Sequence, residues 1–336
     1  MKLIRFASAA MLALSLGSAS AAGAAKSKSE SKTPAKEALP VYKATSGVSG
    51  TLKSIGSDSM NNEMALWSEG FRKMYPGVKI EVEGKGSATA PTALIEGTAQ
   101  FGPMSRPMKG EEVSSFKKKF GYEPTAIKTS LDVLAVYVHR DNPIKALSMQ
   151  DVDAIFSKTR KSGAGKDIAT WGDLGLTGEW ATKPIQLYGR NSASGTYGYF
   201  KEHALAKGDF KDNVKEQPGS AAVVQAIASD KYGIGYSGIG YKTDAVKAVP
   251  LSLKAGKDAV PANNETALEG TYPLGRYLLV YINKAPNQAL DPARREFLLY
   301  VLSAQGQEAV EKNGYISLPP KVIQQERAKL GVVTGG

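Results

Sequence analysis

Four short segments that each supply hydroxyl side chains or free backbone N–H groups, two of them with an arginine, stand where the sequence pattern changes from strand to helix. They are Gly56-Ser57-Asp58-Ser59, Gly86-Ser87-Ala88-Thr89, Ser105-Arg106, and Arg190-Asn191-Ser192-Ala193-Ser194-Gly195-Thr196. A helix start points unsatisfied backbone N–H groups outward and carries the positive end of the helix dipole. Ser and Thr hydroxyls add neutral hydrogen bonds, and arginine offers a planar fork that fits a tetrahedral oxyanion. Converging loops of this kind predict a small anion cage with many donors.

Each loop also has a purely structural interpretation when it is taken alone. Ser and Thr at a helix start are common N-caps, and Gly195 is suited to a simple turn. Arg106 and Arg190 are equally suited to surface ion pairs. The anion-site interpretation is favoured because the same composition recurs at four places in one strand-to-helix register.

Motifs of the common enzyme classes are absent from the sequence. There is no G-x-x-x-x-G-K-[ST] loop, no G-x-S-x-G elbow and no H-E-x-x-H pair. His139 falls in an expected strand and His203 in the middle of an expected helix, so both are interpreted as structural. Two histidines and no cysteine do not make a conventional metal site. We therefore expect no catalytic residue, no metal, no cofactor and no enzymatic activity.

The elements that position the loops follow from hydrophobic periodicity. Apolar residues at spacings of four and three predict a helix from Met60 to Met74, which Tyr75-Pro76-Gly77 ends, and alternation at 78–82 predicts a strand. The alternation of strands and helices favours an α/β fold with largely parallel sheets, in which ligands sit at the carboxyl ends of strands. Further strands are expected at 101–104, 131–139, 185–188, 233–236 and 277–282. Further helices are expected at 91–97, 111–119, 194–206, 221–229 and from Pro292 onward, and Ser148-x-x-Asp151 predicts a capping box.

The N-terminus has the three parts of a secretory signal peptide. Lys2 and Arg5 precede an apolar run from Phe6 to Leu16, and Ala19-Ser20-Ala21 is an A-x-A-like end, so residues 1–22 are interpreted as a signal peptide cleaved near Ala21-Ala22. A buried N-terminal helix is the alternative. Residues 23–47 contain little to bury and predict a disordered linker. The remainder is longer than one core usually holds, so two lobes are expected.

The amino-acid composition limits the cellular compartments and binding partners that are expected for the protein. Absence of cysteine excludes disulfides and a lipidated cysteine, so an exported protein that stays near its cell is expected in a periplasm. The formal net charge of +11 permits nucleic acid, an anionic membrane or an anionic solute as partner. Lysines are scattered, and no basic run is interleaved with aromatic residues, so nucleic acid is not expected.

These loops resemble those of the PstS-type phosphate-binding proteins of bacterial phosphate ABC transporters, and the likeness covers nearly all of residues 50–330. The matching segments are Gly56-Ser57-Asp58-Ser59-Met60, Gly86-Ser87, Phe101-Gly102-Pro103-Met104-Ser105-Arg106 and Arg190-x-x-x-Ser194-Gly195-Thr196, the last being the most specific. The resemblance implies a type II periplasmic-binding-protein fold, with two α/β lobes of central mixed sheets joined by two crossing strands. It implies an inorganic phosphate ligand, permease subunits of an ABC transporter as membrane partners, and a monomer.

The resemblance also divides the chain and the ligand set. Residues 131–139 and 277–282 are the expected crossings, so lobe 1 is 48–134 plus 276–336 and lobe 2 is 135–275. The expected phosphate ligands come from both lobes: Ser57, Asp58, Ser59, Ser87, Ser105 and Arg106 from the first, and Arg190, Ser194, Gly195 and Thr196 from the second.

One departure from the family concerns selectivity. Many members carry an Asp on the third loop that accepts the proton of hydrogen phosphate, and here Ser105 followed by Arg106 stands there. Asp58, another carboxylate or a serine lone pair could take over as acceptor. A receptor for sulfate, molybdate or a phosphonate therefore stays open, as does a secreted phosphatase or adhesion protein on the same fold.

Overall fold

The computed structural model describes residues 39–332, so the predicted signal peptide and most of the predicted linker lie outside the described residues. Residues 39–47 form no helix or strand, but Tyr42 is buried and its hydroxyl donates to Glu296 Oε2 at 2.9 Å. The folded body therefore begins before Tyr42, whereas the sequence places its start at residue 48. Within residues 39–332, no helix combines the length and the apolar character needed to cross a membrane.

The elements alternate along the chain much as the periodicity predicts. The strands are β1 (Gly50–Gly56), β2 (Val78–Gly84), β3 (Gly102–Met104), β4 (Thr125–His139), β5 (Leu147–Ser148), β6 (Gln186–Arg190), β7 (Lys215–Gln217), β8 (Gly233–Gly238), β9 (Val246–Ala248), β10 (Leu251–Ser252) and β11 (Gly275–Ile282). The helices are α1 (Asn61–Met74), α2 (Thr89–Glu96), α3 (Gly110–Phe120), α4 (Met149–Phe156), α5 (Gly195–His203), α6 (Ser220–Ala228), α7 (Asn264–Leu268), α8 (Pro292–Val301), α9 (Ala304–Lys312) and α10 (Pro320–Lys329). Short 3₁₀ turns at Asp58–Met60, Trp171–Leu174, Gly178–Trp180 and Ile239–Tyr241 connect them.

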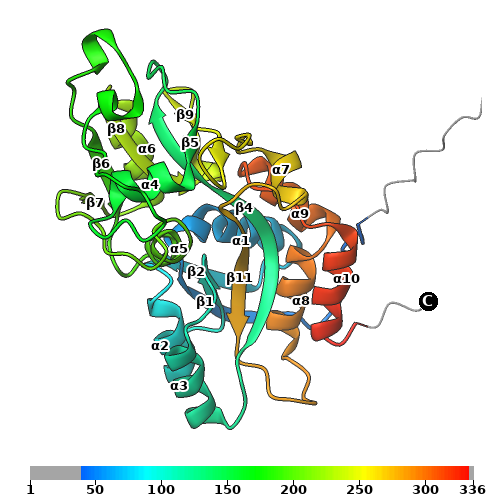
Figure 1. The fold of residues 1–336 in the computed structure, drawn as a ribbon. Coiled ribbons are helices and arrows are strands. Elements are labelled where there is room, and N and C mark those ends of the chain that lie inside the picture. Colours follow the sequence, from blue (N-terminus) through cyan, green and yellow to red (C-terminus); the bar gives the residue numbers. More distant parts are fainter. Residues whose placement is uncertain (1–38, 333–336) are drawn as a thin grey trace, which may run out of the picture. The chain divides into compact units, whose positions relative to one another are not determined.

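The central sheet is mixed, so the expectation of largely parallel sheets is wrong. Its strand order is β3-β11-β4-β8-β6-β7, with β9 also paired to β4. The β3–β11, β11–β4 and β4–β8 pairs are antiparallel, and only β8–β6 and β6–β7 are parallel. Periodicity reports that a strand exists but not which strand it pairs with, and the long strands β4 and β11 here run in opposite directions (Figure 1). The α/β fold with a central mixed sheet is confirmed.

Strand β4 is the longest element of the fold and connects two groups of strands. Residues 125–133 pair with β11, whereas residues 134–138 pair with β8 and residues 137–139 with β9. The strand begins six residues earlier than the apolar run predicts, because its first six residues are mostly polar and are recruited by pairing with β11. This geometry fits the expected crossing strand, while the lobe boundaries 48–134, 135–275 and 276–336 stay a prediction.

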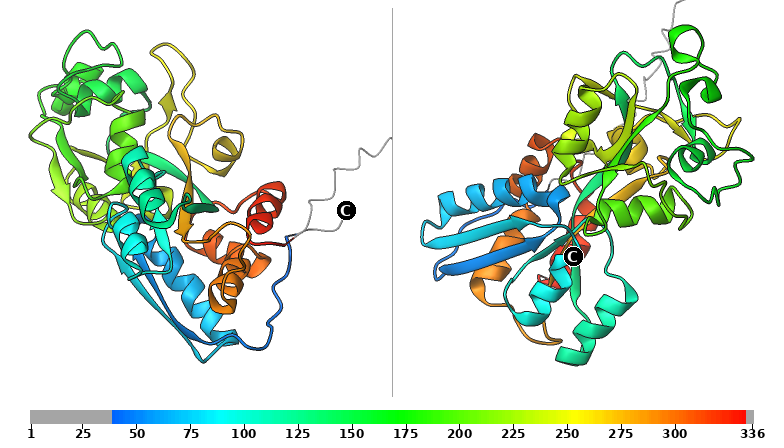
Figure 2. Two further views of the ribbon diagram at one scale, coloured as in Figure 1. Left: turned by 90° about the horizontal axis from the view of Figure 1, so that it is seen from below. Right: turned by 90° about the vertical axis from the view of Figure 1, so that its left-hand side faces the viewer.

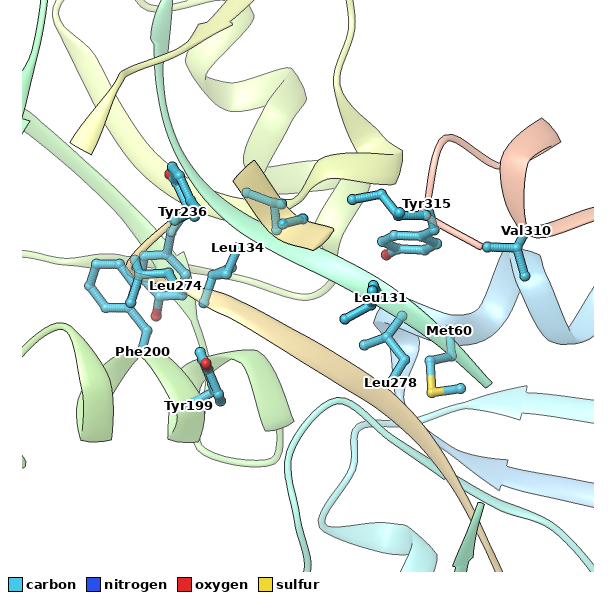
Figure 3. Close-up of a cluster of buried hydrophobic side chains, with 14 of the residues drawn as sticks. Met60, Leu131, Leu134, Tyr199, Phe200, Tyr236, Leu274, Leu278, Val310 and Tyr315 are labelled. Carbon is cyan, nitrogen blue, oxygen red and sulfur yellow. The ribbon is translucent and has the colours of Figure 1, made fainter. Parts of the chain in front are cut away.

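The apolar stripe of α1 lies in the core, as its spacing predicts. Met60, Met64, Trp67 and Phe71 have no exposed surface, and Trp67 Nε1 donates to Gly306 O of α9 at 2.8 Å. Figure 2 shows α1 lying along the β1–β2 pair. The core continues along both long strands, where the buried side chains drawn in Figure 3 include Met60, Leu131, Leu134, Phe200, Tyr236, Leu278 and Tyr315.

Local capping and the strand position of His139 are as predicted, but the helix that carries His203 ends earlier than predicted. Asp151 N donates to Ser148 Oγ at 3.1 Å and Ser148 N donates to Asp151 Oδ2 at 2.8 Å, which confirms the capping box of α4. His139 is the last residue of β4, and His203 is the last residue of α5 rather than a mid-helix residue. The His203 ring packs on Tyr199 with centroids 4.1 Å apart, so its place is a structural one.

Glu63 in the first turn of α1 is an acidic side chain within this core. It is fully buried, and neither carboxyl oxygen has a hydrogen-bond partner among the described residues. Burial raises the pKa of Glu63 well above its usual value. The nearby Ser130 hydroxyl lowers this pKa and the charge of Asp132 raises it, but burial dominates. Burial therefore favours the protonated, neutral form of Glu63 in the folded protein, because an unpaired buried carboxylate would be costly.

This protonation makes stability depend on pH in a definite direction. Because the folded-state pKa of Glu63 is raised, the native state keeps a proton that the unfolded chain releases above about pH 4.3. The contribution of Glu63 is complete below that pH and declines as the pH rises toward the folded pKa. Glu63→Gln should therefore remove part of the alkaline loss of stability, and its melting temperature should gain on the parent from pH 5 to pH 9. Calorimetric melting across this range is the measurement, and parallel curves for the two proteins would contradict the assignment.

Candidate anion-binding site

The four loops predicted from the sequence meet, and backbone hydrogen bonds connect each to another. Ser57 N donates to Pro103 O at 2.7 Å, and Gly86 N donates to Gly56 O at 2.8 Å. Ala88 N donates to Ala193 O at 3.1 Å, which links the second loop to the fourth. These contacts join segments far apart in sequence because the strands β1, β2, β3 and β6 all end at this place.

A group of buried hydroxyls forms the interior of the site. Ser59 Oγ shares a hydrogen bond of 2.8 Å with Thr196 Oγ1 and lies 3.4 Å from Ser220 Oγ. Ser87 Oγ accepts from Ser105 N at 3.0 Å and lies 3.3 Å from Ser105 Oγ. All five side chains are essentially excluded from solvent. Hydroxyls can either donate or accept, so such a group can reorient toward an anion.

Gly195 lies between two of these loops and leaves no room for a side chain. A Cβ placed there would come within 2.2 Å of Ser87 Oγ and 2.6 Å of Ser105 Oγ. The need for glycine at this position is therefore one of space rather than of backbone conformation. Ser194 caps α5 by accepting from Tyr197 N at 3.3 Å, so its hydroxyl also has the simple capping role weighed for these loops. The first N–H groups of α5, which have no intrahelical partners, remain beside the hydroxyls.

Arg190 supplies positive charge to this interior. It is 3 % exposed, its Nη1 donates to Ser220 Oγ at 2.8 Å, and the same nitrogen lies 3.2 Å from Asp58 Oδ2. Burial lowers the pKa of Arg190 and the charge of Asp58 opposes this, so the guanidinium stays charged. Its Nε has no hydrogen-bond partner within residues 39–332, and neither does the buried Ser57 hydroxyl. Unsatisfied buried donors are rare in folded proteins and suit a ligand that accepts hydrogen bonds.

Arg106 is buried but turns its fork away from the hydroxyls. Its Nη1 and Nη2 donate to the two carboxylate oxygens of Glu112 at 2.8 and 2.7 Å, and Nη1 also donates to Pro107 O. Burial raises the pKa of Glu112, but the hydrogen bonds from Arg106 and Lys109 outweigh this and leave the pKa lowered. The bidentate pair places Arg106 at the edge of the site, where a Cβ added to Gly198 would come within 3.3 Å of Arg106 Cδ.

Three residues of this site were not predicted from the sequence. Ser220 opens α6, Asp132 lies on β4, and Arg276 lies on β11. Arg276 donates to Asp132 Oδ2 through Nε at 2.9 Å and Nη2 at 2.7 Å, to Ser105 O at 2.8 Å and to Thr196 Oγ1 at 3.0 Å. A lone Asp in the apolar run 131–139 was a signal, because a charge in a buried strand needs a partner. Ser220 gave no signal beyond an ordinary helix start.

The candidate ligands therefore differ in how the fold presents them. Ser59, Ser87, Ser105, Arg190, Gly195 and Thr196 come together inside the site, with Ser57 buried beside them and Asp58 partly exposed beside Arg190. Ser194 caps the helix and Arg106 pairs with Glu112. Ser192 of the fourth loop is exposed. In the part of the chain that the structure describes, no cluster of three His, Cys, Asp or Glu side chains is arranged to hold a metal ion.

Comparison with known proteins identifies the family. A model of the PBP superfamily domain matches residues 42–305. The phosphate-binding protein PstS of Pseudomonas aeruginosa is 58% identical over 295 residues, which are 88% of this chain and 91% of that protein. The chain belongs to the PstS family. The family assignment made from the four loops is thereby confirmed.

Solved structures of the family agree with the fold. A substrate-binding protein of a phosphate ABC transporter from Clostridium perfringens, solved with bound phosphate, superposes with a TM-score of 0.68 at 26% identity and covers 80% of this chain and 100% of its own. A phosphate transport receptor from Vibrio cholerae gives a TM-score of 0.61 at 20% identity over 80% of this chain and 100% of its own. The type II periplasmic-binding-protein fold implied by the resemblance is confirmed.

Gly195→Ala tests whether the close approach of the loops matters for binding. Its methyl group would force the Ser87 and Ser105 hydroxyls apart, so oxyanion binding should weaken by about 1–3 kcal/mol, the usual cost of overpacking. Gly165→Ala is the matched control, because nothing lies within 4 Å of a Cβ at that exposed glycine. Calorimetric titration with phosphate measures the affinity of both variants. If a folded Gly195→Ala protein binds phosphate as tightly as the parent, the close approach of the Ser87 and Ser105 hydroxyls to residue 195 is not needed for binding.

Proposed function

We propose that this chain is a periplasmic receptor that captures inorganic phosphate between two lobes and delivers it to the permease of an ABC transporter. The observation that carries the proposal is the buried Arg190, whose Nε is unsatisfied among the described residues, beside hydroxyls from several loops. Its relatives are named as phosphate-binding and phosphate-transport proteins, which supports the same ligand.

The site suits capture rather than chemistry. Removing an oxyanion from water is costly unless charge and hydrogen bonds replace its hydration, and Arg190 with the hydroxyls and the start of α5 provides both. Each buried guanidinium already has its own carboxylate: Asp58 beside Arg190, Asp132 beside Arg276 and Glu112 beside Arg106. The ligand would therefore be held mainly by directed donors rather than by excess positive charge. We propose a monomeric binding protein without enzymatic activity.

The ligand set follows from this arrangement. Ser57, Ser59, Ser87, Ser105, Arg190, Gly195 and Thr196 would donate to phosphate, with the N–H groups at the start of α5 facing the anion beside Ser194. Arg106 would lie at the rim. Asp58 would accept the proton of hydrogen phosphate, since both of its contacts with Arg190 and Ser220 N use Oδ2 and leave Oδ1 free among the described residues.

Calorimetry on protein stripped of bound ligand tests the function directly. A receptor that loads from dilute solute should bind phosphate with a Kd of about 1 μM or tighter, about −8 kcal/mol. Sulfate and molybdate should bind far more weakly, because a fully ionised anion places a lone pair against the Asp58 carboxylate. A preference for either of them over phosphate would replace the proposed ligand, and no binding at millimolar phosphate would remove the function.

Arg190→Ala and Arg106→Ala form a matched pair of substitutions. Both remove a buried guanidinium, but only Arg190 directs its donors to the hydroxyl group. Arg190→Ala should weaken phosphate binding by about 2–5 kcal/mol, and Arg190→Lys should recover part of this, because an ammonium lacks the planar fork. Arg106→Ala should cost about 1 kcal/mol or less, and its effect should fade with added salt. Equal losses of phosphate affinity in the two alanine variants would show that Arg190 is not a more important ligand than Arg106.

Asp58→Asn tests the proton acceptor. The amide keeps one acceptor oxygen for Arg190 but removes the negative charge, so phosphate should bind more weakly by about 1.5–3 kcal/mol while sulfate binds more tightly. Glu112→Gln is the control, because it neutralises the carboxylate beside Arg106 and should leave the ratio of phosphate to sulfate affinity unchanged. An unchanged ratio in Asp58→Asn would give the acceptor role to a serine hydroxyl or to another carboxylate.

A further inference from the structure

The Asp132–Arg276 pair is the most deeply buried ion pair of the described residues that touches the anion site. Both side chains are at most 2 % exposed, and they face each other across the antiparallel β4–β11 ladder, where Arg276 pairs with Asp132 in register. Asp132 Oδ2 accepts from both Nε and Nη2 of Arg276. Figure 1 shows the two strands running side by side through the middle of the fold.

The remaining bonds of this pair leave the β4–β11 ladder. Arg276 Nη1 donates to Ser105 O at 2.8 Å and Nη2 donates to Thr196 Oγ1 at 3.0 Å, while Asp132 Oδ1 accepts from Ile239 N at 3.0 Å. With the lobe boundaries expected from the sequence, Ser105 belongs to lobe 1. Thr196 and Ile239 belong to lobe 2. Two of the three bonds therefore cross between the expected lobes, and one of them ends on a proposed phosphate ligand.

The N-terminal half of α5 is fixed to β11 by further contacts. The Tyr199 ring lies under the Arg276 guanidinium at 5.2 Å, and Tyr199 OH donates to Gly275 O at 2.7 Å. Thr196 and Tyr199 are three residues apart, so both face the same side of the helix. The position of the helix start that faces the anion is thereby tied to the position of Arg276.

Arg276 is itself poorly placed to grip an anion. Four of its five N–H donors are used by Asp132, Ser105 O and Thr196, and the nearby carboxylate compensates its charge. A pair that served only the β4–β11 ladder would not need bonds to the loop after β3, to α5 and to the turn after β8. The geometry thus suits a role in which Arg276 positions the residues that bind the anion rather than binding the anion itself.

We propose that Asp132 and Arg276 form a latch that holds the phosphate-loaded form closed, with Arg276 as a positioning residue for Thr196 and Ser105. The latch rests on the proposed function. It forms when the two lobes meet around the anion, and it slows phosphate release without taking part in the first encounter. Loss of the latch therefore raises the rate of dissociation and leaves the rate of association nearly unchanged.

Stopped-flow kinetics of phosphate binding and release, with a fluorophore that reports closure, separate these two rates. Arg276→Gln removes the charge and the fork, and release should be faster by about 10- to 100-fold, the range for losing a hydrogen bond to a charged group. Association should change by less than about 3-fold, since the encounter does not use the latch. Asp132→Asn should act in the same direction, and the double variant should be less than additive because the two residues act as one unit.

Controls keep the outcomes distinguishable. Arg295→Gln breaks another arginine–carboxylate pair, the more exposed one with Glu296 on α8 and outside the site, and should release phosphate like the parent. If Arg276→Gln does not fold, Arg276→Lys carries the test, because an ammonium cannot span Asp132, Ser105 O and Thr196 together, and release should still be at least about 5-fold faster. A folded Arg276 variant that releases phosphate at the rate of the parent protein would overturn the latch alone. Absence of phosphate binding by the parent would overturn the proposed function, and the latch with it.

Discussion

Burial of the Arg190 guanidinium is the constraint on which the site depends. A charge taken out of water must be compensated, and here Asp58 partly compensates it from one side while Ser220 accepts one of its hydrogen bonds. The backbone N–H of Arg190 donates to the hydroxyl of Tyr236, whose ring stacks on Phe200 at 3.9 Å. The position of the guanidinium is therefore fixed by the core beneath it as well as by its polar neighbours.

The chain topology turns this local arrangement into a site. Residues that are distant in sequence reach one place because the strands that carry them end there, and each loop then bonds to another loop through its backbone. The close approach at Gly195 leaves hydroxyls and N–H groups facing inward with little solvent contact. Directed donors in such a place interact more strongly with an anion than they would in water.

Much of this arrangement was predictable from the sequence, because the relevant signals are local. Hydroxyl residues at strand-to-helix junctions marked all four loops, and the stripe from Met60 to Phe71 marked a buried helix face. Which strands pair with each other was not predictable, since the antiparallel pairing of β4 with β11 joins residues about 140 positions apart. Arg276 was not predicted as a site residue for the same reason: only the folding of the sheet and of α5 brings it next to Asp132 and Thr196. Arg106 was counted as a ligand because sequence cannot show that Glu112 occupies its fork.

A crystal structure of the protein with bound phosphate would show directly whether the four loops hold the anion. Phosphate oxygens are expected at hydrogen-bond distance, about 2.7–3.2 Å, from the Arg190 guanidinium, the Ser87 hydroxyl and the first N–H groups of α5. Arg276 is expected to remain on Asp132 rather than turning to the anion. Phosphate bound elsewhere, such as in the basic cavity lined by Lys158, Arg160 and Lys211, with the four loops empty, would contradict the account.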